Sequence, residues 1–457
     1  MMYNKTLTIF NNNIQEIVLN LKDTCLEKVL YYRDEGNMNI VLSVYAQENE
    51  EKYVIRFKKI SSDSTERNCN DHKHELMSFI VFEELLQKYF DHFTVVPKIV
   101  FVDVDINALN EFLMRDRPAV RRKKIIGYNY GLVYRDVAFL PKEIYIGKPM
   151  NGEFKDSPTI CIEIKVKQGY MMDEDISTRS YETKKCRYCY FQYLKLKTTK
   201  ISNISQYCPI NLFSGKADRM NRAIKGLFEN PQNNLKMFQD GKMVYNEYSP
   251  DKVLLKRIMK SLFPDAKSVD KQESLLINLI RRTLIKDFTC CDMNVDVCST
   301  YECNEDVHLR NCHAEKFPQL PKNCILYSIL KAQHLVRDNF SIMEYLEDNI
   351  NCEDGYGQII QDYRMGSTAL DCSVMITFRQ INVNEDFNIE SDKVFDKRNY
   401  MKLTGPTGCS HHFISNVTVV DLDEKKDSFA HFHKYKKQYQ ESKIAYLEYI
   451  NSMQHVA

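Results

Sequence analysis

The chain has 457 residues and a nearly balanced charge, with 63 Lys and Arg against 62 Asp and Glu. This length suits about two to four folding units, or two lobes of one larger enzyme. The net charge of +1 excludes a global basic field of the kind that attracts nucleic acid, so any polyanion site must be local. Only 14 residues are glycine, and none fits the Rossmann fingerprint or the P-loop. A nucleotide would therefore have to be held in another way.

No secretory signal and no apolar run of roughly 18 residues, the length of a membrane-spanning helix, is evident in the sequence. The 15 cysteines are therefore expected to be reduced thiols. We predict a protein of the nucleus and cytoplasm with no membrane association.

The first 135 residues carry the pattern of a small sheet with one helix. Weak helical spacing comes first, over residues 12–32. Stretches rich in Val, Ile, Tyr and Phe then predict strands, and one apolar face predicts a helix. In chain order these are strands over 39–45 and 52–59, a helix over 75–90 and a strand over 95–104. We place a domain boundary after residue 135.

Residues 136–457 are predicted to form a larger domain of mixed type. Clean alternation over 159–167 predicts a strand with one apolar face and one face that carries Glu163, Lys165 and Lys167. Helical patterns follow, and strands return late in the chain. The helices are expected over 216–228, 253–262, 273–288, 323–335 and 434–453, and the late strands over 373–378 and 417–422. The predicted fold class is α+β.

Two acids lie beside the late strands. Asp371 comes just before one strand, and Asp421 ends the other, with Asp423 two residues later. If the strands pair antiparallel, Asp371 and Asp421 share one site. Phosphoryl transfer needs such a pair, because one carboxylate accepts the proton of the nucleophile and another holds a metal ion. The alternative is that these acids merely end strands.

Three further motifs could bind phosphates. Lys165 and Lys167 project from one strand face about 7 Å apart, unless this is a solvated edge strand. Helical spacing places Arg187 and Lys195 on one stripe, which an ordinary solvated helix face would also explain. Asn233 and Asn234 follow Pro231. They predict either a turn or a site whose amide groups hydrogen-bond to an oxygen-rich ligand.

Together these stretches resemble the inositol-pentakisphosphate 2-kinase family, from residues 32–37 near one end to 421–425 near the other. The most specific pieces are 161–167, which is similar to the E-I-K-P-K strand of the family, Ser214-Gly215 with the helix into 231–234, 371–376, and the D-L-D-x-K of 421–425. The resemblance implies a two-lobed fold distantly like that of protein kinases. A small N-lobe, 1–135, would cover the nucleotide, and a larger C-lobe, 136–457, would bind inositol phosphate.

The activity that the resemblance implies is transfer of a phosphoryl group from ATP, with Mg²⁺, to the 2-hydroxyl of inositol 1,3,4,5,6-pentakisphosphate. The product would be inositol hexakisphosphate. The alternatives are an inositol-polyphosphate-binding scaffold with weak or no kinase activity and a kinase of another ring position. We expect small-molecule substrates only, no direct contact with nucleic acid, and a monomer.

Residue roles also follow from the resemblance. Asp371 would be the catalytic base, Lys165 would stabilise the transferring phosphoryl group, and Asp421 and Asp423 would hold magnesium. ATP would be bound by Glu35, Gly36, Asn37, Arg56, Arg135, Asp136, Glu163, Lys165 and Asp421. The substrate phosphates would be bound by Lys167, Arg187, Lys195, Asn233, Asn234, Lys236 and Lys425.

The chain departs from the family pattern at three places. Val166 replaces the proline of E-I-K-P-K, and Phe191 stands where a histidine is expected. A basic pair expected after Lys425 is out of register. Its candidate replacements are Lys426, His431, His433 and Lys434.

A Cys/His-rich insertion occupies about 288–315. It contains Cys290, Cys291, Cys298, Cys303, His308, Cys312 and His313. Four such residues could bind a structural Zn²⁺, which plant members of the family carry. The insertion has no clean C-x₂-C pair, so free thiols are the favoured interpretation.

Overall fold

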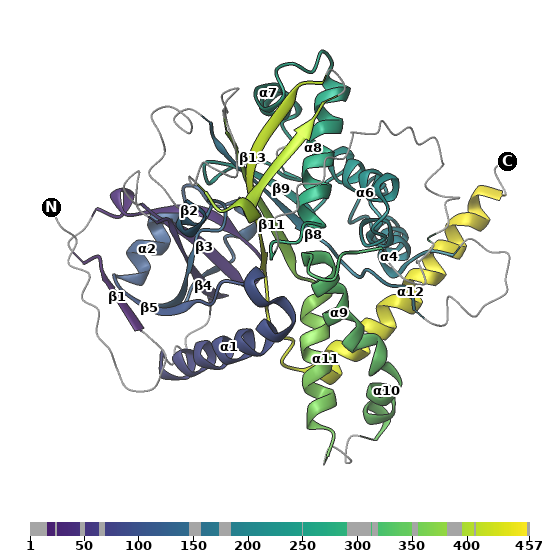
Figure 1. The fold of residues 1–457 in the computed structure, drawn as a ribbon. Helices are drawn as coiled ribbons and strands as arrows, with labels where there is room; N and C mark the ends of the chain where they lie inside the picture. The colour runs from purple at the N-terminus through teal and green to yellow at the C-terminus, as the bar shows by residue number, and fades with distance from the viewer. Residues whose placement is uncertain are drawn as a thin grey trace. The chain divides into compact units, whose positions relative to one another are not determined.

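The computed structural model describes residues 16–22, 25–45, 51–63, 69–145, 157–172, 184–248, 250–289, 312, 319–349, 355–381, 395–405 and 408–454. The chain divides into two compact units, Met1–Lys142 and Glu143–Ala457, each built on its own sheet (Figure 1). The boundary placed after residue 135 coincides with the end of strand β7 (Tyr130–Arg135) and, as a lobe boundary, stays a prediction. None of the helices in the described ranges is long and apolar enough to cross a membrane.

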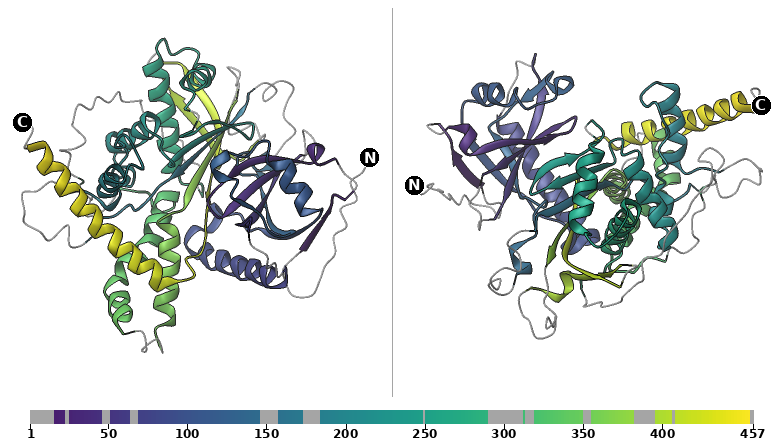
Figure 2. Two further views of the ribbon diagram at one scale, coloured as in Figure 1. Left: turned by 180° about the vertical axis from the view of Figure 1, so that it is seen from behind. Right: turned by 90° about the horizontal axis from the view of Figure 1, so that it is seen from above.

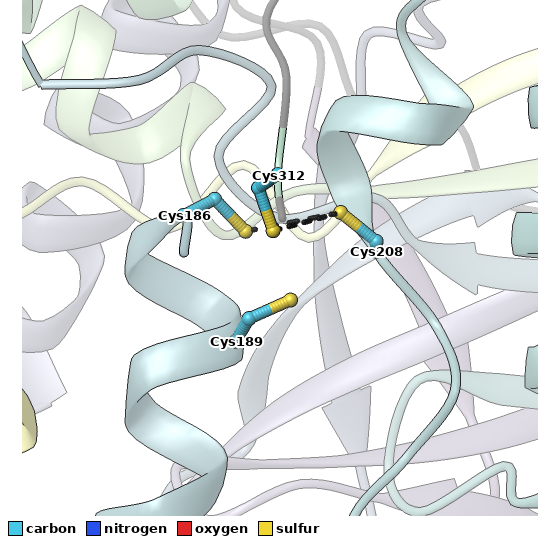
Figure 3. A group of neighbouring side chains, drawn as sticks. All are labelled: Cys186, Cys189, Cys208 and Cys312. Carbon is cyan, nitrogen blue, oxygen red and sulfur yellow. Dashed lines mark hydrogen bonds between the residues drawn. The ribbon is translucent and has the colours of Figure 1, made fainter. Parts of the chain in front are cut away.

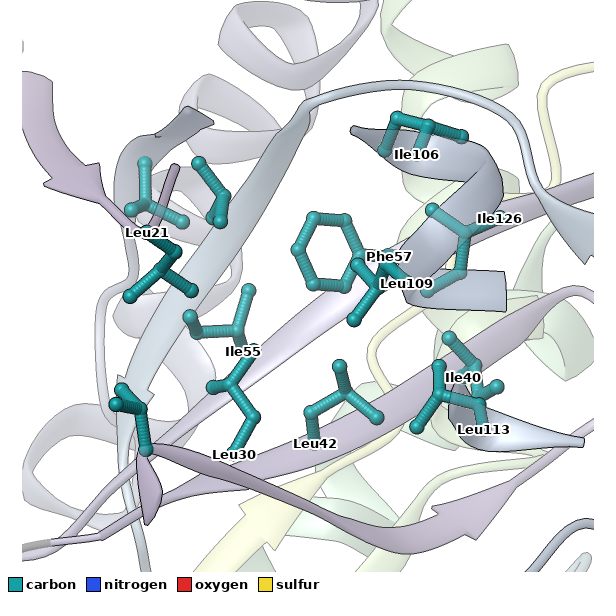
Figure 4. Close-up of a cluster of buried hydrophobic side chains, with 13 residues drawn as sticks. Leu21, Leu30, Ile40, Leu42, Ile55, Phe57, Ile106, Leu109, Leu113 and Ile126 are labelled. Atoms are coloured by element: carbon teal, nitrogen blue, oxygen red, sulfur yellow. The ribbon is translucent and has the colours of Figure 1, made fainter. Parts of the chain in front are cut away.

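The sheet of unit 1 has the order β1-β5-β7-β4-β3-β2, with β6 paired to β4. Its other strands are β1 (Glu16–Asn20), β2 (Leu30–Glu35), β3 (Asn39–Val44), β4 (Tyr53–Ser61), β5 (Lys98–Asp103) and β6 (Lys124–Ile126). Neighbouring residues of β5 face opposite sides of the sheet: Val100 packs with Leu109 of helix α2 (Ile106–Leu113), and Ile99 packs with Ile80 of helix α1 (Cys69–Phe90). The two helices therefore cover opposite faces, and Figure 4 shows the larger core on the α2 side.

Most predicted elements of unit 1 are confirmed, namely the strands over 39–45, 52–59 and 95–104 and the helix over 75–90. The helical spacing over 12–32 is wrong. This stretch contains β1, a short 3₁₀ turn and the start of β2. Ile17 and Leu19 both pack on the core, with the two-residue period of a strand. A short apolar run is compatible with both the helical period and the strand period. This stretch forms a strand because β1 pairs with β5.

The sheet of unit 2 is antiparallel throughout, in the order β10-β9-β8-β11-β13-β12. Its strands are β8 (Thr159–Lys165), β9 (Leu235–Gln239), β10 (Lys242–Tyr245), β11 (Ser373–Ile381), β12 (Tyr400–Thr404) and β13 (Ser410–Val420). Both late strands are thus confirmed. β8 lies between β9 and β11, so the alternative of a solvated edge strand is wrong.

The helices of unit 2 confirm the predicted helical stretches between the early and late strands. They are α4 (Arg187–Lys197), α5 (Pro209–Leu212), α6 (Ala217–Glu229), α7 (Lys252–Leu262), α8 (Val269–Leu284), α9 (Ile325–Asp338), α10 (Phe340–Asp348), α11 (Gly357–Ala369) and α12 (Ser428–Gln454). The last helix, α12, begins earlier than the predicted residue 434. It lies along α4 (Figure 2), where Tyr446 packs edge-on against Tyr190 and Tyr193.

A buried ion-pair group holds one end of the unit 1 sheet. The guanidinium of Arg117, which is 1% exposed, donates two hydrogen bonds of 2.9 Å to the carboxylate of Glu35. Lys59 donates to the same carboxylate, and Arg117 also donates to the carbonyl oxygens of Arg121 and Lys124. Burial alone would raise the pKa of Glu35, but Arg117 and Lys59 hold it below its ordinary value. The buried charges of Glu35, Lys59 and Arg117 compensate one another only while all three side chains are present.

We predict that Arg117→Met lowers the free energy of unfolding by about 3–5 kcal/mol, because removing one partner leaves buried charge without its match. Chemical denaturation followed by circular dichroism measures this. Arg115→Met is the control, since Arg115 pairs with Glu27 at the surface, where ion pairs contribute little. Equal stability of the two variants would contradict the structural role of Arg117.

Candidate active site

Three strand ends of unit 2 meet at Ser373. In the antiparallel register Ser373 lies opposite Lys165 of β8 on one side and Val420 of β13 on the other. Asp371 precedes this position by two residues, and Asp421 follows Val420 directly. The antiparallel pairing on which the shared site depended is therefore confirmed. It brings Asp371, Asp421 and Lys165 to one edge of the sheet.

Each of the two aspartates pairs with a lysine from β8 or its extension. Lys165 Nζ lies 3.0 Å from Asp421 Oδ2, and Lys167 Nζ lies 2.8 Å from Asp371 Oδ1. Lys425 Nζ lies 3.9 Å from the other oxygen of Asp371. The side chains of Asp371 and Asp421 are 52% and 43% exposed, so both carboxylates remain accessible from solution.

The interior of the site is completed by Glu163 and Ser373. The hydroxyl of Ser373 lies 3.1 Å from Glu163 Oε1 and 3.2 Å from Asp421 Oδ2. The second oxygen of Glu163 lies 3.6 Å from Lys236 Nζ on β9. Glu163, a predicted nucleotide residue, and Lys236, a predicted substrate residue, thus lie side by side on the adjacent strands β8 and β9.

Strain is stored at two of these positions. Lys167 and Asp421 adopt left-handed backbone conformations, with φ values of 59° and 61°. Residues with a Cβ adopt this region only when the surrounding structure requires it, and such strain collects at functional sites. The turn at each strand end directs the side chain back toward the shared edge, as the two ion pairs show.

The mutual attraction of these groups sets their charge states. Burial opposes ionisation of Asp371, but Lys167, Lys165 and Lys425 together lower its pKa to about 2. Burial likewise disfavours the charge of Lys165, yet the carboxylates of Asp421, Asp371 and Glu163 raise its pKa above the ordinary value. Asp371 is therefore ionised and Lys165 is protonated at neutral pH.

The donor set fits a hard divalent cation. Asp421 and Asp423 offer carboxylate oxygens within two residues of each other, and Ser373 adds a hydroxyl beside Asp421. Mg²⁺ prefers oxygen ligands, usually one or two carboxylates plus substrate phosphates and water. Asp423 is placed by its carbonyl oxygen, which accepts a hydrogen bond from Thr368 Oγ1.

Helix α4 contributes the next cations. Arg187 stacks on the ring of Tyr435, 3.9 Å from its centroid, and donates to Gln438 of α12. Lys195 is half-buried with its ammonium over the Phe191 ring, and burial together with the charge of Lys167 lowers its pKa to about 8. The solvated-face alternative is therefore wrong for these two residues, and Phe191 supports a cation where a histidine was expected.

The structure separates the candidates that follow Lys425. Tyr363 hydrogen-bonds His431 Nδ1 at 2.9 Å, and burial with the charges of Lys425 and Arg187 lowers the pKa of His431 to about 4. His433 instead pairs with Glu347 and is 71% exposed. His431 therefore lies within electrostatic range of Lys425 and Arg187, whereas His433 is paired with Glu347.

Asn233 and Asn234 lie in a turn before β9. Asn233 is exposed, whereas Asn234 is 1% exposed and donates from its amide to the hydroxyl of Tyr188. No described residue donates a hydrogen bond to Asn234 Oδ1. The carbonyl oxygen of Asn234 accepts from Lys165 N, which ties this turn to the end of β8.

The remaining predicted nucleotide residues lie in unit 1, and their roles stay predictions. Glu35 is the last residue of β2, and Gly36 and Asn37 lie in the turn between β2 and β3, where Lys59 Nζ donates to Gly36 O and Lys124 Nζ to Asn37 O.

Two of the others lie where β7 ends. Arg135 is the last residue of β7, and Asp136 is buried beside Arg33 with its pKa raised by burial. Arg56 lies over the ring of Phe79.

Sequence reasoning missed Gln333, a fully buried residue of α9. Its Nε2 donates to the carbonyl oxygens of Lys167 (2.8 Å) and Ala369 (3.0 Å), and its Oε1 accepts from Gly169 N. Gln333 thereby joins the segment after β8 to the segment before β11, which carry Lys167 and Asp371. A polar residue on the apolar face of a helix was the available signal.

Of the residues weighed as zinc ligands, Cys312 is described, and its thiol lies with those of Cys186, Cys189 and Cys208. Cys290, Cys291, Cys298, Cys303, His308 and His313 lie outside the described residues. Cys186 and Cys189 form a clean C-x₂-C pair. In the sequence, this stretch was interpreted only through its cations, Arg187 and Lys195, and not as a source of metal ligands.

Comparison with known proteins gives one family. A family model described as inositol-pentakisphosphate 2-kinase matches residues 32–441. An inositol-pentakisphosphate 2-kinase of Danio rerio is 25% identical over 86% of this chain and 88% of its own length. Enzymes of the same name from Oryza sativa subsp. indica and Arabidopsis thaliana are 28% and 29% identical over 50% and 47% of this chain, covering 50% and 52% of their own lengths. The model match spans most of the chain and all of the unit 2 site, so the chain belongs to the inositol-pentakisphosphate 2-kinase family.

Proposed function

We propose that this protein transfers a phosphoryl group from ATP, with Mg²⁺, to the 2-hydroxyl of inositol 1,3,4,5,6-pentakisphosphate and so makes inositol hexakisphosphate. The observation that carries the proposal is the meeting of Asp371, Asp421, Lys165 and Lys167 around Ser373. This edge of the sheet supplies a proton acceptor, a metal ligand and two cations at once.

The finer fold assignment belongs to the same proposal. Unit 1 would be the nucleotide-covering N-lobe and unit 2 the inositol phosphate-binding C-lobe of a fold distantly like that of protein kinases. Location in the nucleus and cytoplasm, the monomeric state and the lack of nucleic-acid binding are further parts of the proposal, resting on the sequence.

The resting ion pairs explain how the site could bind its polyanion. Five phosphates carry roughly −8 to −10 at pH 7, far more than one carboxylate. Phosphates that engage Lys167 and Lys425 would take them from Asp371, to which both are paired. With those charges redirected, the pKa of Asp371 rises from about 2 toward the range in which a carboxylate is an effective base.

Lys165 stabilises the charge that develops on the transferring group, since its ammonium lies at the sheet edge between the two acids. Mg²⁺ held by Asp421 and Asp423 would neutralise charge on the nucleotide phosphates. Ser373 orients the carboxylates of Glu163 and Asp421 relative to each other. Asp371 accepts the proton of the attacking 2-hydroxyl.

The other substrate phosphates would meet a surface of cations supported by aromatic rings. Arg187 on Tyr435 and Lys195 on Phe191 are both held in place by packing, and His431 lies within the same group of charges. Fixed cations suit a rigid ligand, because little side-chain entropy is lost when the ligand binds. Lys236 and the two asparagines lie on the β9 side.

The direct test of the proposal is identification of the product. The full-length protein incubated with magnesium ATP and a panel of inositol phosphates is expected to convert the 1,3,4,5,6-pentakisphosphate to the hexakisphosphate, as resolved by chromatography and phosphorus NMR. Binding of the pentakisphosphate without any product would favour the scaffold alternative. A different phosphorylated isomer would favour a kinase of another ring position.

Asp371→Asn tests the base and the ion-pair exchange together. Loss of the proton acceptor should lower kcat by about 10²–10⁴-fold. Affinity for the pentakisphosphate, measured by calorimetry, should be unchanged or higher, because Lys167 and Lys425 no longer pair with a carboxylate. Near-normal turnover would remove Asp371 from the role of base.

Lys195 predicts a pH dependence of substrate binding. Its pKa of about 8 means that the ammonium loses its proton as pH rises through this value, so affinity for the polyanion should fall above about pH 8, by at most tenfold per pH unit. Lys195→Arg should remove this fall, because guanidinium stays charged. Lys195→Ala should raise KM about ten- to a hundredfold.

Lys197→Ala is the matched control on the same helix, since Lys197 is exposed and pairs with Glu448. It should leave KM and its pH dependence unchanged. If both alanine variants raise KM equally, general electrostatic attraction, and not a specific contact of Lys195, explains binding.

A further inference from the structure

Four cysteine thiols of unit 2, none of them part of the candidate active site described above, converge on one point. The sulfur atoms of Cys186, Cys189, Cys208 and Cys312 all lie within 4.8 Å of one another (Figure 3). Cys186, Cys208 and Cys312 are buried, and Cys189 is half-buried. Cys208 Sγ lies 3.7 Å from Cys312 Sγ and 4.0 Å from Cys186 Sγ.

The four ligands come from three separate segments. Cys186 is the N-cap of α4, and Cys189 lies in the first turn of the same helix. Cys208 is the N-cap of α5. Cys312 is tied to the α4 side, because its backbone N–H donates to Lys184 O at 2.7 Å. A C-x₂-C pair with two distant cysteines is a common way to build a four-thiolate site.

The spacing of the sulfurs fits one tetrahedral ion. Zn²⁺ binds thiolates at about 2.3 Å, which places tetrahedral sulfurs about 3.8 Å apart. The distances of 3.7 and 4.0 Å agree with this value. They are far longer than a disulfide bond, at about 2.05 Å. We infer that Cys186, Cys189, Cys208 and Cys312 form a structural zinc site.

The surroundings suit the charge of such a site. Four thiolates and one Zn²⁺ carry a net charge of −2, which is costly to bury without compensation. The N-terminal end of α4 carries partial positive charge where Cys186 and Cys189 lie. Lys185 is 2% exposed and lines a small cavity together with Cys189 and Cys312. The positive end of α4 offsets part of the thiolate charge.

The site would fix the position of α4. Arg187 directly follows one ligand, and Lys195 lies two turns further along the same helix. The zinc would therefore anchor the helix that carries two cations of the proposed substrate surface. This inference goes beyond the proposed function, and metal binding can be measured without any turnover.

The experiment is metal analysis of the full-length protein after extensive dialysis, by inductively coupled plasma mass spectrometry. About one zinc per chain is expected. Cys186→Ser should lose the zinc, because serine preserves the cap of α4 but supplies a poor ligand. Cys324→Ser is the matched control, since Cys324 is also a buried helix N-cap, of α9, and should retain one zinc.

A second readout does not depend on any variant. Cobalt exchanged into the unmodified protein should give the thiolate-to-metal charge-transfer absorption and intense visible bands of a tetrahedral four-sulfur site. Absence of stoichiometric zinc together with absence of these bands would overturn the inference. So would a disulfide among these residues, shown by peptide mapping, or retention of zinc by Cys186→Ser.

Discussion

The site of unit 2 depends on the antiparallel pairing of β11 with both β8 and β13. Because antiparallel neighbours run in opposite directions, the start of β11 lies beside the ends of the other two strands. Lys165 and Asp421, 256 residues apart in sequence, become an ion pair 3.0 Å long. Each acid of this edge is paired with a lysine, so the ion pairs limit the repulsion between like charges placed close together.

Much of this could be predicted from local sequence. Alternation over 159–167 shows which side chains share a face, and acids beside two apolar runs show where strands end. The order of strands in the sheet was not available, because pairing depends on segments far apart in the chain. This is why β8 could be mistaken for an edge strand and why the partner of each lysine became known only from the structure.

An error in a helix boundary changes where a candidate site residue is expected to lie. A polar helix predicted from residue 434 leaves His431 in a loop of unknown direction, whereas α12 begins at Ser428 and places His431 within its first turn. The contact between His431 and Tyr363 follows from that position. Gln333 was overlooked for a related reason. Its importance comes from the backbone groups that it joins, and these belong to two loops that no local pattern connects.

The nearly zero net charge of the chain is consistent with the proposed handling of a polyanion. Unpaired cations in one small region would repel one another, and the pairing of Lys167 and Lys425 with Asp371 removes that cost before substrate arrives. On the proposed mechanism the same pairing couples recognition to chemistry. A ligand that lacks the phosphates for Lys167 and Lys425 leaves Asp371 bound to its lysines, with a pKa of about 2, and hence a weak base. Selectivity would then act on kcat as well as on binding, because only a substrate that carries the phosphates for Lys167 and Lys425 frees the carboxylate that must accept the proton of its 2-hydroxyl.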